Sequence, residues 1–270
     1  MSLFLGASFL VNSLVKNKRL LLEMTKRDIS DRYAGQILGS FWAVIHPVMM
    51  ISVYVFMFGV VFRTKVDSSI TVPGDHTLYM LSGLVAWLVT ADVLGRGSSI
   101  ISGQAALVKQ VVFPLEILPV KVVFSTLPTL FVGVLGLILY GVVGVGRAHW
   151  GFLLFPLAAV PLYLFLLGIA FLLSAVGVFL RDLKDIVQMY ALIGLYVAPV
   201  FYLMDWVPKS IRAIIYLNPM TVFIECFHDA GYYGSIRTSV WVVACVLGSA
   251  SFLIGATLFA RLKPQFGSHL

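Results

Sequence analysis

Six long apolar runs are the feature that most restricts how this chain can fold. An α-helix rises about 1.5 Å per residue, so about 20 apolar residues cross the roughly 30 Å hydrocarbon core of a bilayer. The sequence is 60% hydrophobic and only 11% charged, whereas soluble domains hold about 25% charged residues. We therefore expect an all-α polytopic membrane protein with six transmembrane helices. The predicted spans are Leu38–Phe62, Thr77–Gly95, Pro119–Val145, Gly151–Leu180, Ile186–Met204 and Ser239–Ala260.

The positive charge of the chain is distributed unevenly among the predicted loops. Lys and Arg residues of membrane proteins gather in cytoplasmic segments and set the orientation. The net charge of +7 is therefore no sign of nucleic-acid binding. With the N-terminus inside, the cytoplasmic segments hold twice as many Lys and Arg residues as the outer loops. We expect both termini to be cytoplasmic and expect no nucleic-acid partner.

The N-terminal segment is too charged to cross a membrane. Between Ser8 and Tyr33, apolar residues are interleaved with Lys and Arg, and the leucines recur near helical spacing. This pattern favours an amphipathic helix lying in the membrane interface, with a flexible basic tail as the alternative. The sequence thus divides into an N-terminal interfacial segment, residues 1–36, and a six-span domain, residues 37–270.

The segment between the fifth and sixth spans holds two short apolar pieces, Pro208–Leu217 and Met220–Tyr233. Each is too short to cross a bilayer but long enough for an interfacial or re-entrant helix. Asn218 and Pro219 separate the pieces, and Asn before Pro is a helix-start signal. We expect a short re-entrant helical hairpin that forms an outer gate, with Pro208, Asn218 and Pro219 at its turns.

Few ionisable residues lie within the apolar runs. Asp92 precedes Arg96 by four residues, a spacing that brings two side chains together on a helix, so we favour a local ion pair over a proton relay. Glu225, His228 and Asp229 have the spacing of metal ligands on a helix, but no second ligand pair accompanies them. We interpret these three as the solvated face of an outer helix and expect no metal site.

Motifs for catalysis and nucleotide binding are missing from the sequence. No GxxxxGK[ST] motif occurs, so the chain has no P-loop to cradle ATP. No nucleophile–base set stands out, and neither a relay of intramembrane acids nor a matching pair of broken spans supports secondary transport. We expect a transport subunit that is not an enzyme and binds no cofactor itself.

Aromatic residues make up 13% of the chain and recur along two spans. Sugar rings present flat C–H faces that lie well on aromatic rings, so these residues are candidates for a glycan channel. The alternative is the aromatic belt that any membrane protein has at its interfaces. Tyr54 and Tyr196 lie nearer mid-span, which favours the channel. The residues are Trp42, Tyr54, Phe58 and Phe62 in the first span and Tyr190, Tyr196 and Tyr202 in the fifth.

A cluster of four charged residues interrupts the apolar sequence between the fourth and fifth spans, at Arg181-Asp182-Leu183-Lys184-Asp185. Arg181 and Asp185 are i, i+4 partners, so this segment can be a helical turn with paired charges. The alternative is an ordinary polar connection between spans.

The order of these parts resembles a known family. A basic amphipathic N-terminal helix leads into LGSFWAVIHPVMMISVYVFMFGVVF, LVKQVVFPLEILPVK precedes the third span, RDLKDI joins the fourth and fifth, and YLNPMT occupies the outer hairpin. Over nearly its whole length the chain resembles the permease subunit of ABC-2-type polysaccharide exporters of the Wzm type, which move O-antigen. Teichoic-acid export permeases are closely similar.

The resemblance implies a homodimer of six-span subunits in the bacterial inner membrane, with two copies of a separate cytoplasmic ATPase that bind ATP and Mg. ATP hydrolysis would drive a lipid-linked polysaccharide outward through a channel between the permeases, which the first, second and fifth spans would line. The implied channel residues are Trp42, Tyr54, Phe58, Trp87, Tyr190 and Tyr196. The implied ATPase contacts are the coupling helix Arg181, Asp182, Leu183, Lys184 and Asp185, and secondly Lys26 and Arg27.

Two alternatives remain open from the sequence. One is an ABC-2 permease for a small lipid or drug. The other is a channel or secondary transporter of another fold. Co-purification with an ATPase favours either ABC-2 interpretation over a channel or carrier.

Overall fold

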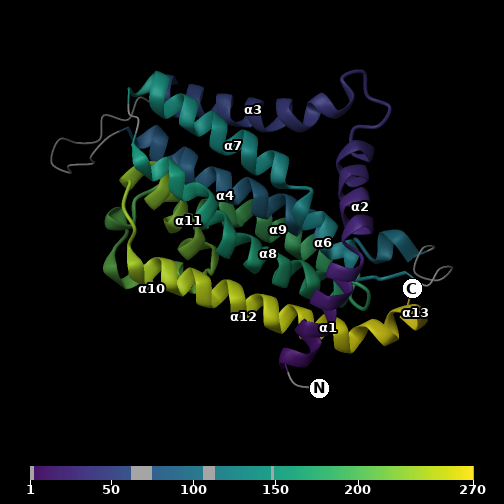
Figure 1. The fold of residues 1–270 in the computed structure, drawn as a ribbon. Coiled ribbons are helices and arrows are strands. Elements are labelled where there is room, and N and C mark those ends of the chain that lie inside the picture. Colours follow the sequence, from purple (N-terminus) through teal and green to yellow (C-terminus); the bar gives the residue numbers. More distant parts are fainter. Residues whose placement is uncertain (1–2, 62–74, 106–112, 147–148, 270) are drawn as a thin grey trace.

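Helices form all the regular structure that the computed structural model describes, which covers residues 3–61, 75–105, 113–146 and 149–269. The predicted all-α class is therefore confirmed for these residues. Phe62, the predicted end of the first span, and residues 107–112 of the segment before the third span lie outside them. The long helices run side by side, and α2 runs crosswise to them (Figure 1).

Five of the described helical segments are long and apolar enough to cross a membrane, and they match five of the six predicted spans. The first joins α3, Trp42–Tyr54, to a π-helix. The third joins α6, Ile117–Phe124, to α7, Leu127–Leu139. The five segments are Gly39–Val61, His76–Gly97 (α4), Ile117–Gly144, Trp150–Val176 (α8 from Phe155) and Thr238–His269 (α12 to Leu262, α13 from Phe266).

Glycines set how closely α8 and α12 pack. A Cβ atom on Gly168 of α8 would lie 2.2 Å from the backbone carbonyl carbon of Ser251, and one on Gly255 of α12 would lie 2.0 Å from the oxygen of Gly168. No larger residue fits at either position. Small residues at such crossings let helix backbones approach in membranes, where van der Waals packing contributes much of the association.

The predicted fifth span differs most from expectation. Its helix, α9, covers Leu183–Val197 and has 15 residues, which is about 22 Å of helix and too short to cross a bilayer alone. The helix stops because Ala198 precedes Pro199, and the proline ring forces Ala198 out of the helical region to φ −71° and ψ 148°. Residues 198–203 continue as ordered non-helical chain.

The next two pieces form helices with the predicted bounds. These are α10, Lys209–Leu217, and α11, Met220–His228, which a π-helical turn extends to Tyr233. The two are bent by 104° at Asn218-Pro219, the geometry of a broken span or a re-entrant loop. The side chain of Asn218 accepts a hydrogen bond from the backbone N–H of Met220, 3.1 Å away, and so caps α11 as predicted.

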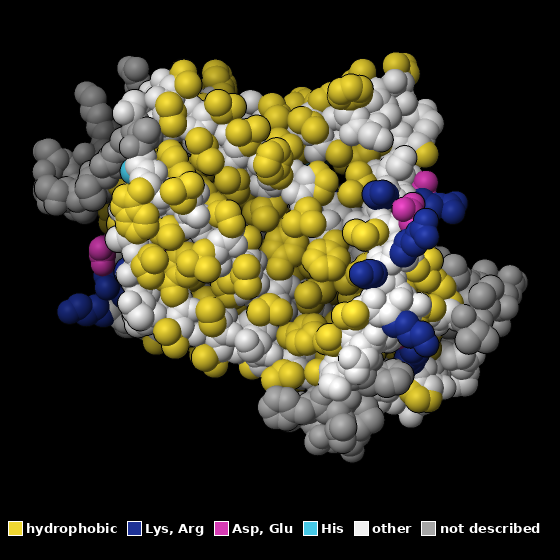
Figure 2. All heavy atoms as spheres, in the orientation of Figure 1, with side chains coloured by type: hydrophobic (Ala, Val, Ile, Leu, Met, Phe, Trp, Pro, Cys, Tyr) yellow, Lys and Arg dark blue, Asp and Glu magenta, His cyan; other side chains and the backbone are white. Residues whose placement is uncertain are grey.

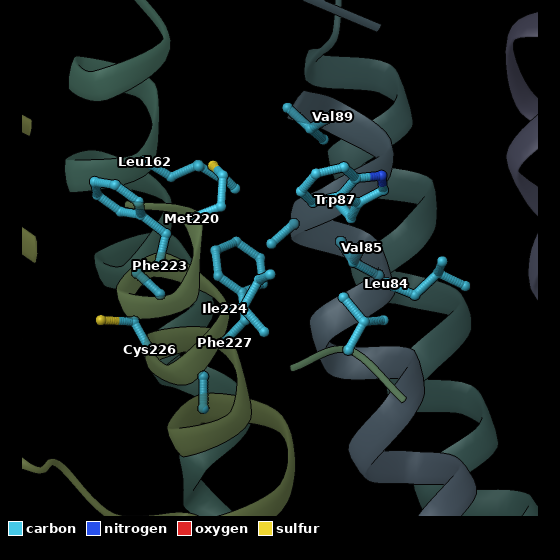
Figure 3. Close-up of a cluster of buried hydrophobic side chains, with 14 of the residues drawn as sticks. Leu84, Val85, Trp87, Val89, Leu162, Met220, Phe223, Ile224, Cys226 and Phe227 are labelled. Atoms are coloured by element: carbon cyan, nitrogen blue, oxygen red, sulfur yellow. The ribbon is translucent and has the colours of Figure 1, made fainter. Parts of the chain in front are cut away.

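Helix α11 lies in the core of the protomer, and every residue from Met220 to His228 is buried. Its side chains pack against α4 and α8 (Figure 3). The prediction that Glu225, His228 and Asp229 form a solvated face is therefore wrong. The three polar residues are only 3%, 1% and 0% exposed, because α4, α8 and α12 pack around this segment.

The N-terminal segment forms two helices rather than the single predicted one. They are α1, Leu3–Lys16, and α2, Lys18–Asp31, and the chain bends at Asn17, whose side chain donates to the carbonyl of Ser13. Helix α1 packs against α12, with Leu10 fully buried. The segment is helical as expected, but it is docked on the helical bundle rather than separate from it.

The surface has a broad apolar band between two charged ends (Figure 2). Charged side chains gather over α2 at one end and in a smaller group at the opposite end, while hydrophobic side chains cover the area between them. Both chain ends are drawn on the side of α2 (Figure 1). This distribution matches the apolar and polar layers that a bilayer imposes on a spanning protein.

Candidate functional site

Three of the predicted channel aromatics meet around a fourth aromatic residue. The ring of Phe201 lies 5.6 Å from Tyr54, 5.7 Å from Phe58 and 5.9 Å from Tyr196, centroid to centroid. Tyr54 also stacks on Phe58 at 6.2 Å. We call these four residues the aromatic cluster. Tyr196 is 66% exposed, so the cluster reaches the protein surface between α3 and α9.

The break after α9 places Phe201 in this cluster. Ala198, Pro199 and Val200 are buried, and the hydroxyl of Tyr79 on α4 donates to the carbonyl of Tyr202 at 3.3 Å. Non-helical backbone at membrane depth is tolerated only where protein buries it or a water-filled cavity adjoins it. We missed Phe201 in the sequence, although the Ala-Pro step that ends α9 was the signal that could have found it.

Trp87 and Tyr190 do not belong to the aromatic cluster. Trp87 is 2% exposed and lies in the core beside α11 (Figure 3). It is not on the protein surface where a channel residue is expected. Its ring fits against Gly194 of α9, where a Cβ atom would lie 2.4 Å from it. Tyr190 packs on Trp87 at 6.3 Å and donates to the side chain of Asn218 at 3.0 Å.

Trp42 lies in a separate cleft near the start of the first span. The cleft holds about 670 Å³. Trp42 is therefore not continuous with the aromatic cluster within one protomer. The other lining residues are Tyr33, Gln36, Ile37, Leu38 and His46.

The charged segment Arg181–Asp185 lies exposed at a turn. Arg181 and Asp182 form the turn, and α9 begins at Leu183, so the segment enters α9 directly instead of forming a separate short helix. Among the ion pairs of the described residues there is none between Arg181 and Asp185, contrary to the predicted i, i+4 pair. Asp185 instead lies in the first turn of α9, where the helix dipole favours a carboxylate.

Lys26 and Arg27 are also exposed, and each pairs within α2. Lys26 lies 3.7 Å from Glu23, and the Nε of Arg27 lies 3.1 Å from Asp31. Exposed pairs of this kind contribute roughly 0–1 kcal/mol to stability. Both side chains are therefore available to a partner at low cost.

The predicted outer hairpin is fixed by an ionic contact between two buried carboxylates and an arginine that is 41% exposed. Asp229 accepts hydrogen bonds from the Nε of Arg237 at 2.7 Å and from the indole of Trp241 at 3.0 Å. Glu225 lies 3.6 Å from Arg237 and accepts a bond from Tyr216 at 2.8 Å. These contacts tie α10 and α11 to the start of α12. Within the described residues no group of three His, Cys, Asp or Glu side chains is arranged to hold a metal ion.

Known proteins are similar in sequence to most of this chain. Residues 19–232 match the family described as ABC-2 type transporter. The chain belongs to the ABC-2 type transporter family. Among curated ABC-2 relatives, the O-antigen export system permease protein RfbA of Klebsiella pneumoniae is 26% identical over 255 residues, 93% of this chain and 95% of the relative. The protein of the same name from Myxococcus xanthus is 28% identical over 267 residues, 97% and 99% of the two chains.

These similarities confirm the resemblance to ABC-2 permeases that the sequence motifs indicated. Together with the five apolar helices, they identify the chain as a membrane-spanning permease of the ABC-2 family.

Proposed function

We propose that this chain is the channel-forming subunit of an ATP-driven exporter of a lipid-linked, O-antigen-like polysaccharide. The substrate would pass from the cytoplasm to the outer face of the bacterial inner membrane. The similarity to O-antigen export permeases supports the substrate class. The aromatic cluster carries the proposal, because it is the surface of the chain that suits a sugar polymer.

A channel must contact a moving polymer without binding tightly at any one position. Directional hydrogen bonds to each sugar would have to break together whenever the polymer shifted register. Aromatic faces make contacts that are remade as each ring passes, as they do for single-stranded nucleic acids held without sequence preference. Tyr196 is the most exposed ring of the cluster, and the half-buried rings of Tyr54, Phe58 and Phe201 stack beside it.

The proposed assembly is a homodimer with two ATPase subunits. The first span and α9 expose large apolar side chains, such as Phe56 and Ile193, and a second copy placed there would enclose the aromatic clusters of both protomers. We count α9 with residues 198–204 as the fifth span, which brings each subunit to six. The ATPases would contact the Arg181–Asp185 turn and the exposed face of α2 from the cytoplasm. They would bind the ATP and Mg for which this chain has no P-loop.

Complementation of an export-deficient cell tests this function. The chain and its ATPase are expressed together in a bacterium that lacks its own O-antigen exporter, and surface glycan is measured. We expect surface polysaccharide that depends on a hydrolysis-competent ATPase. If the pair co-purifies and hydrolyses ATP but exports only a small lipid or drug, the glycan proposal is wrong. If no ATPase co-purifies with the chain, the exporter proposal itself is wrong.

A further inference from the structure

Five charged side chains from three helices meet at the end of the molecule where α2 lies. Asp28 and Arg32 come from the end of α2, Asp92 and Arg96 from α4, and Lys121 from α6. We call these five residues the ionic joint. Asp92 lies 2.8 Å from Arg96 and 3.0 Å from Arg32. Asp28 lies 2.8 Å from Arg96 and 3.4 Å from Lys121.

The predicted Asp92–Arg96 pair is thus confirmed, but it is part of a larger network. Each carboxylate is shared by cations from two or more helices, and the hydroxyl of Ser125 accepts bonds from Arg32 at 3.1 Å and from Arg96 at 3.0 Å. Asp28 therefore links α2 to both α4 and α6, and Asp92 links α4 to α2 through Arg32.

The ionic joint is shielded from water, unlike the other ion pairs of α2. The side chains of its members are between 6% and 27% exposed. Those of Arg27 and Asp31 are 80% and 62% exposed. Salt screens exposed pairs strongly and partly buried pairs much less. One face of α2 is therefore held to α4 and α6, while the opposite face, with Lys26 and Arg27, faces outward.

Helix α4 connects the ionic joint to the aromatic cluster. Most residues of α4 are buried, and Trp87 on α4 is fitted against Gly194 of α9. Tyr196 and Val197 follow Gly194 at the end of α9, and Phe201 lies in the non-helical chain beyond that end. The ionic joint and the aromatic cluster are thus linked along α4, through the contact of Trp87 with Gly194, and along α9.

We propose that the ionic joint makes α2 and α4 move as one body, so that a displacement of α2 by the ATPase reaches the aromatic cluster. This inference rests on the proposed function, in which the outward face of α2 contacts the ATPase. Contact between neighbours does not by itself demonstrate coupling, so the test must measure movement as well as export.

The movement is measured with spin labels in the full transporter. Cysteines replace Ser30, an exposed residue of α2, and Gly95 of α4, where an added side chain meets nothing within 4 Å. Cys226 and Cys245 are removed from this background. We expect the Ser30–Gly95 label distance to stay the same with and without ATP. In Arg32→Gln, which cuts the α2 link to Asp92 but leaves Asp92 paired with Arg96, we expect the distance to broaden.

Export and ATP hydrolysis are measured in the same variant. We expect Arg32→Gln to lower export roughly tenfold while ATPase binding and hydrolysis stay near normal. Arg32→Lys, which keeps the charge, should recover part of the export. Lys16→Gln is the control, because it removes an exposed cation from α1, outside both the ionic joint and α2; its export should be unchanged.

The outcomes separate this proposal from the proposed function. If the wild-type label distance changes with ATP, or if Arg32→Gln exports normally, the ionic joint is only an anchor and the inference is wrong. If the wild type exports no polysaccharide but the labels behave as expected, the joint stands and the glycan assignment fails. Loss of folding is detected by gel filtration, and Arg32→Lys then supplies the decisive measurement.

Discussion

At the scale of single residues, the rings of the aromatic cluster are expected to act in transport beyond their packing. Alanine at Tyr54, Phe58 or Tyr196 removes a stacking surface worth about 1 kcal/mol, which corresponds to roughly fivefold slower export per ring. Leucine should restore packing but not export. Surface polysaccharide is measured against expression, dimerisation and ATPase binding, and Phe131→Ala, an exposed ring on α7, serves as control. Full export by all three leucine variants would mean that the rings only fill space.

Sequence patterns predict local residue contacts much better than distant ones. The Asp92–Arg96 pair follows from i, i+4 spacing, and the Asn218 cap follows from local turn chemistry, so both could be predicted. The burial of Trp87 depends on Gly194, which is distant in the chain. The clustering of Tyr54 with Phe201 depends on where α9 stops. Such contacts follow from the tertiary arrangement, which periodicity does not encode.

At the scale of elements, the docking of α1 is expected to depend on pH through Glu116. This residue is 1% exposed and accepts bonds from Lys263, at 2.6 Å, and from Ser13 of α1. Burial disfavours its carboxylate, but the bonds from Lys263 and Ser13 outweigh burial and hold the pKa of Glu116 below its ordinary value of 4.5.

A lowered carboxyl pKa stabilises the docked state at pH values above about 4.5, and this stability is lost as the pH falls through the lower folded pKa. A spin label at Asn12, an exposed residue of α1, should stay immobile from pH 7 to 5 and become mobile only as the pH falls through the lowered pKa of Glu116. In Glu116→Gln, mobility should no longer change across this acid range. An unchanged acid transition in that variant would assign the effect to another group.

The hairpin of α10 and α11 is expected to depend on Arg237 for stability. Arg237→Ala leaves Asp229 and Glu225 buried without their cation. Breaking a fully buried pair from one side costs about 3–5 kcal/mol, and because Arg237 is itself 41% exposed we expect a loss below that range. Thermal unfolding in detergent or nanodiscs should show a clear loss of stability. Lys209→Ala, at the exposed start of α10, should change little. Equal stability of the two variants would contradict the role of this contact.

The elements themselves were predictable where hydropathy alone decides them. Five spans and the two pieces of the hairpin follow from apolar length and from Asn218-Pro219. The end of α9 was mispredicted because the apolar pattern continues through Ala198-Pro199 although the helix does not. The sequence does not predict the burial of α11, because three polar residues on a short helix suggest an exposed face. In the structure Arg237 pairs with both carboxylates, Trp241 donates to Asp229, and the ring of His228 stacks on Tyr79.

At the scale of the whole molecule, the two charged ends are expected to have different partners. The end at α2 carries the ionic joint, the outward face of α2 and the N- and C-terminal ends (Figure 1). Arg237 precedes α12, whose start lies beside α10 at the end of the molecule opposite α2 (Figure 1). In the proposed assembly the ATPases approach only the end at α2, so charge changes at the two ends should have different effects.

Reversal of charge in the Arg181–Asp185 turn tests this arrangement. Arg181→Glu and Asp182→Lys alter exposed side chains, so membrane insertion and thermal stability should stay near the wild-type values. If the turn docks on the ATPase, misplaced charges repel their partners there, and each reversal should weaken co-purification of the ATPase and lower export. The weakening should be greater at low salt, where screening is least.

The control is Asp205→Lys, which reverses a charge that is 85% exposed near the hairpin and should leave ATPase association unchanged. Normal association and export in both turn variants would show that the ATPase docks elsewhere, with the outward face of α2 as the remaining candidate.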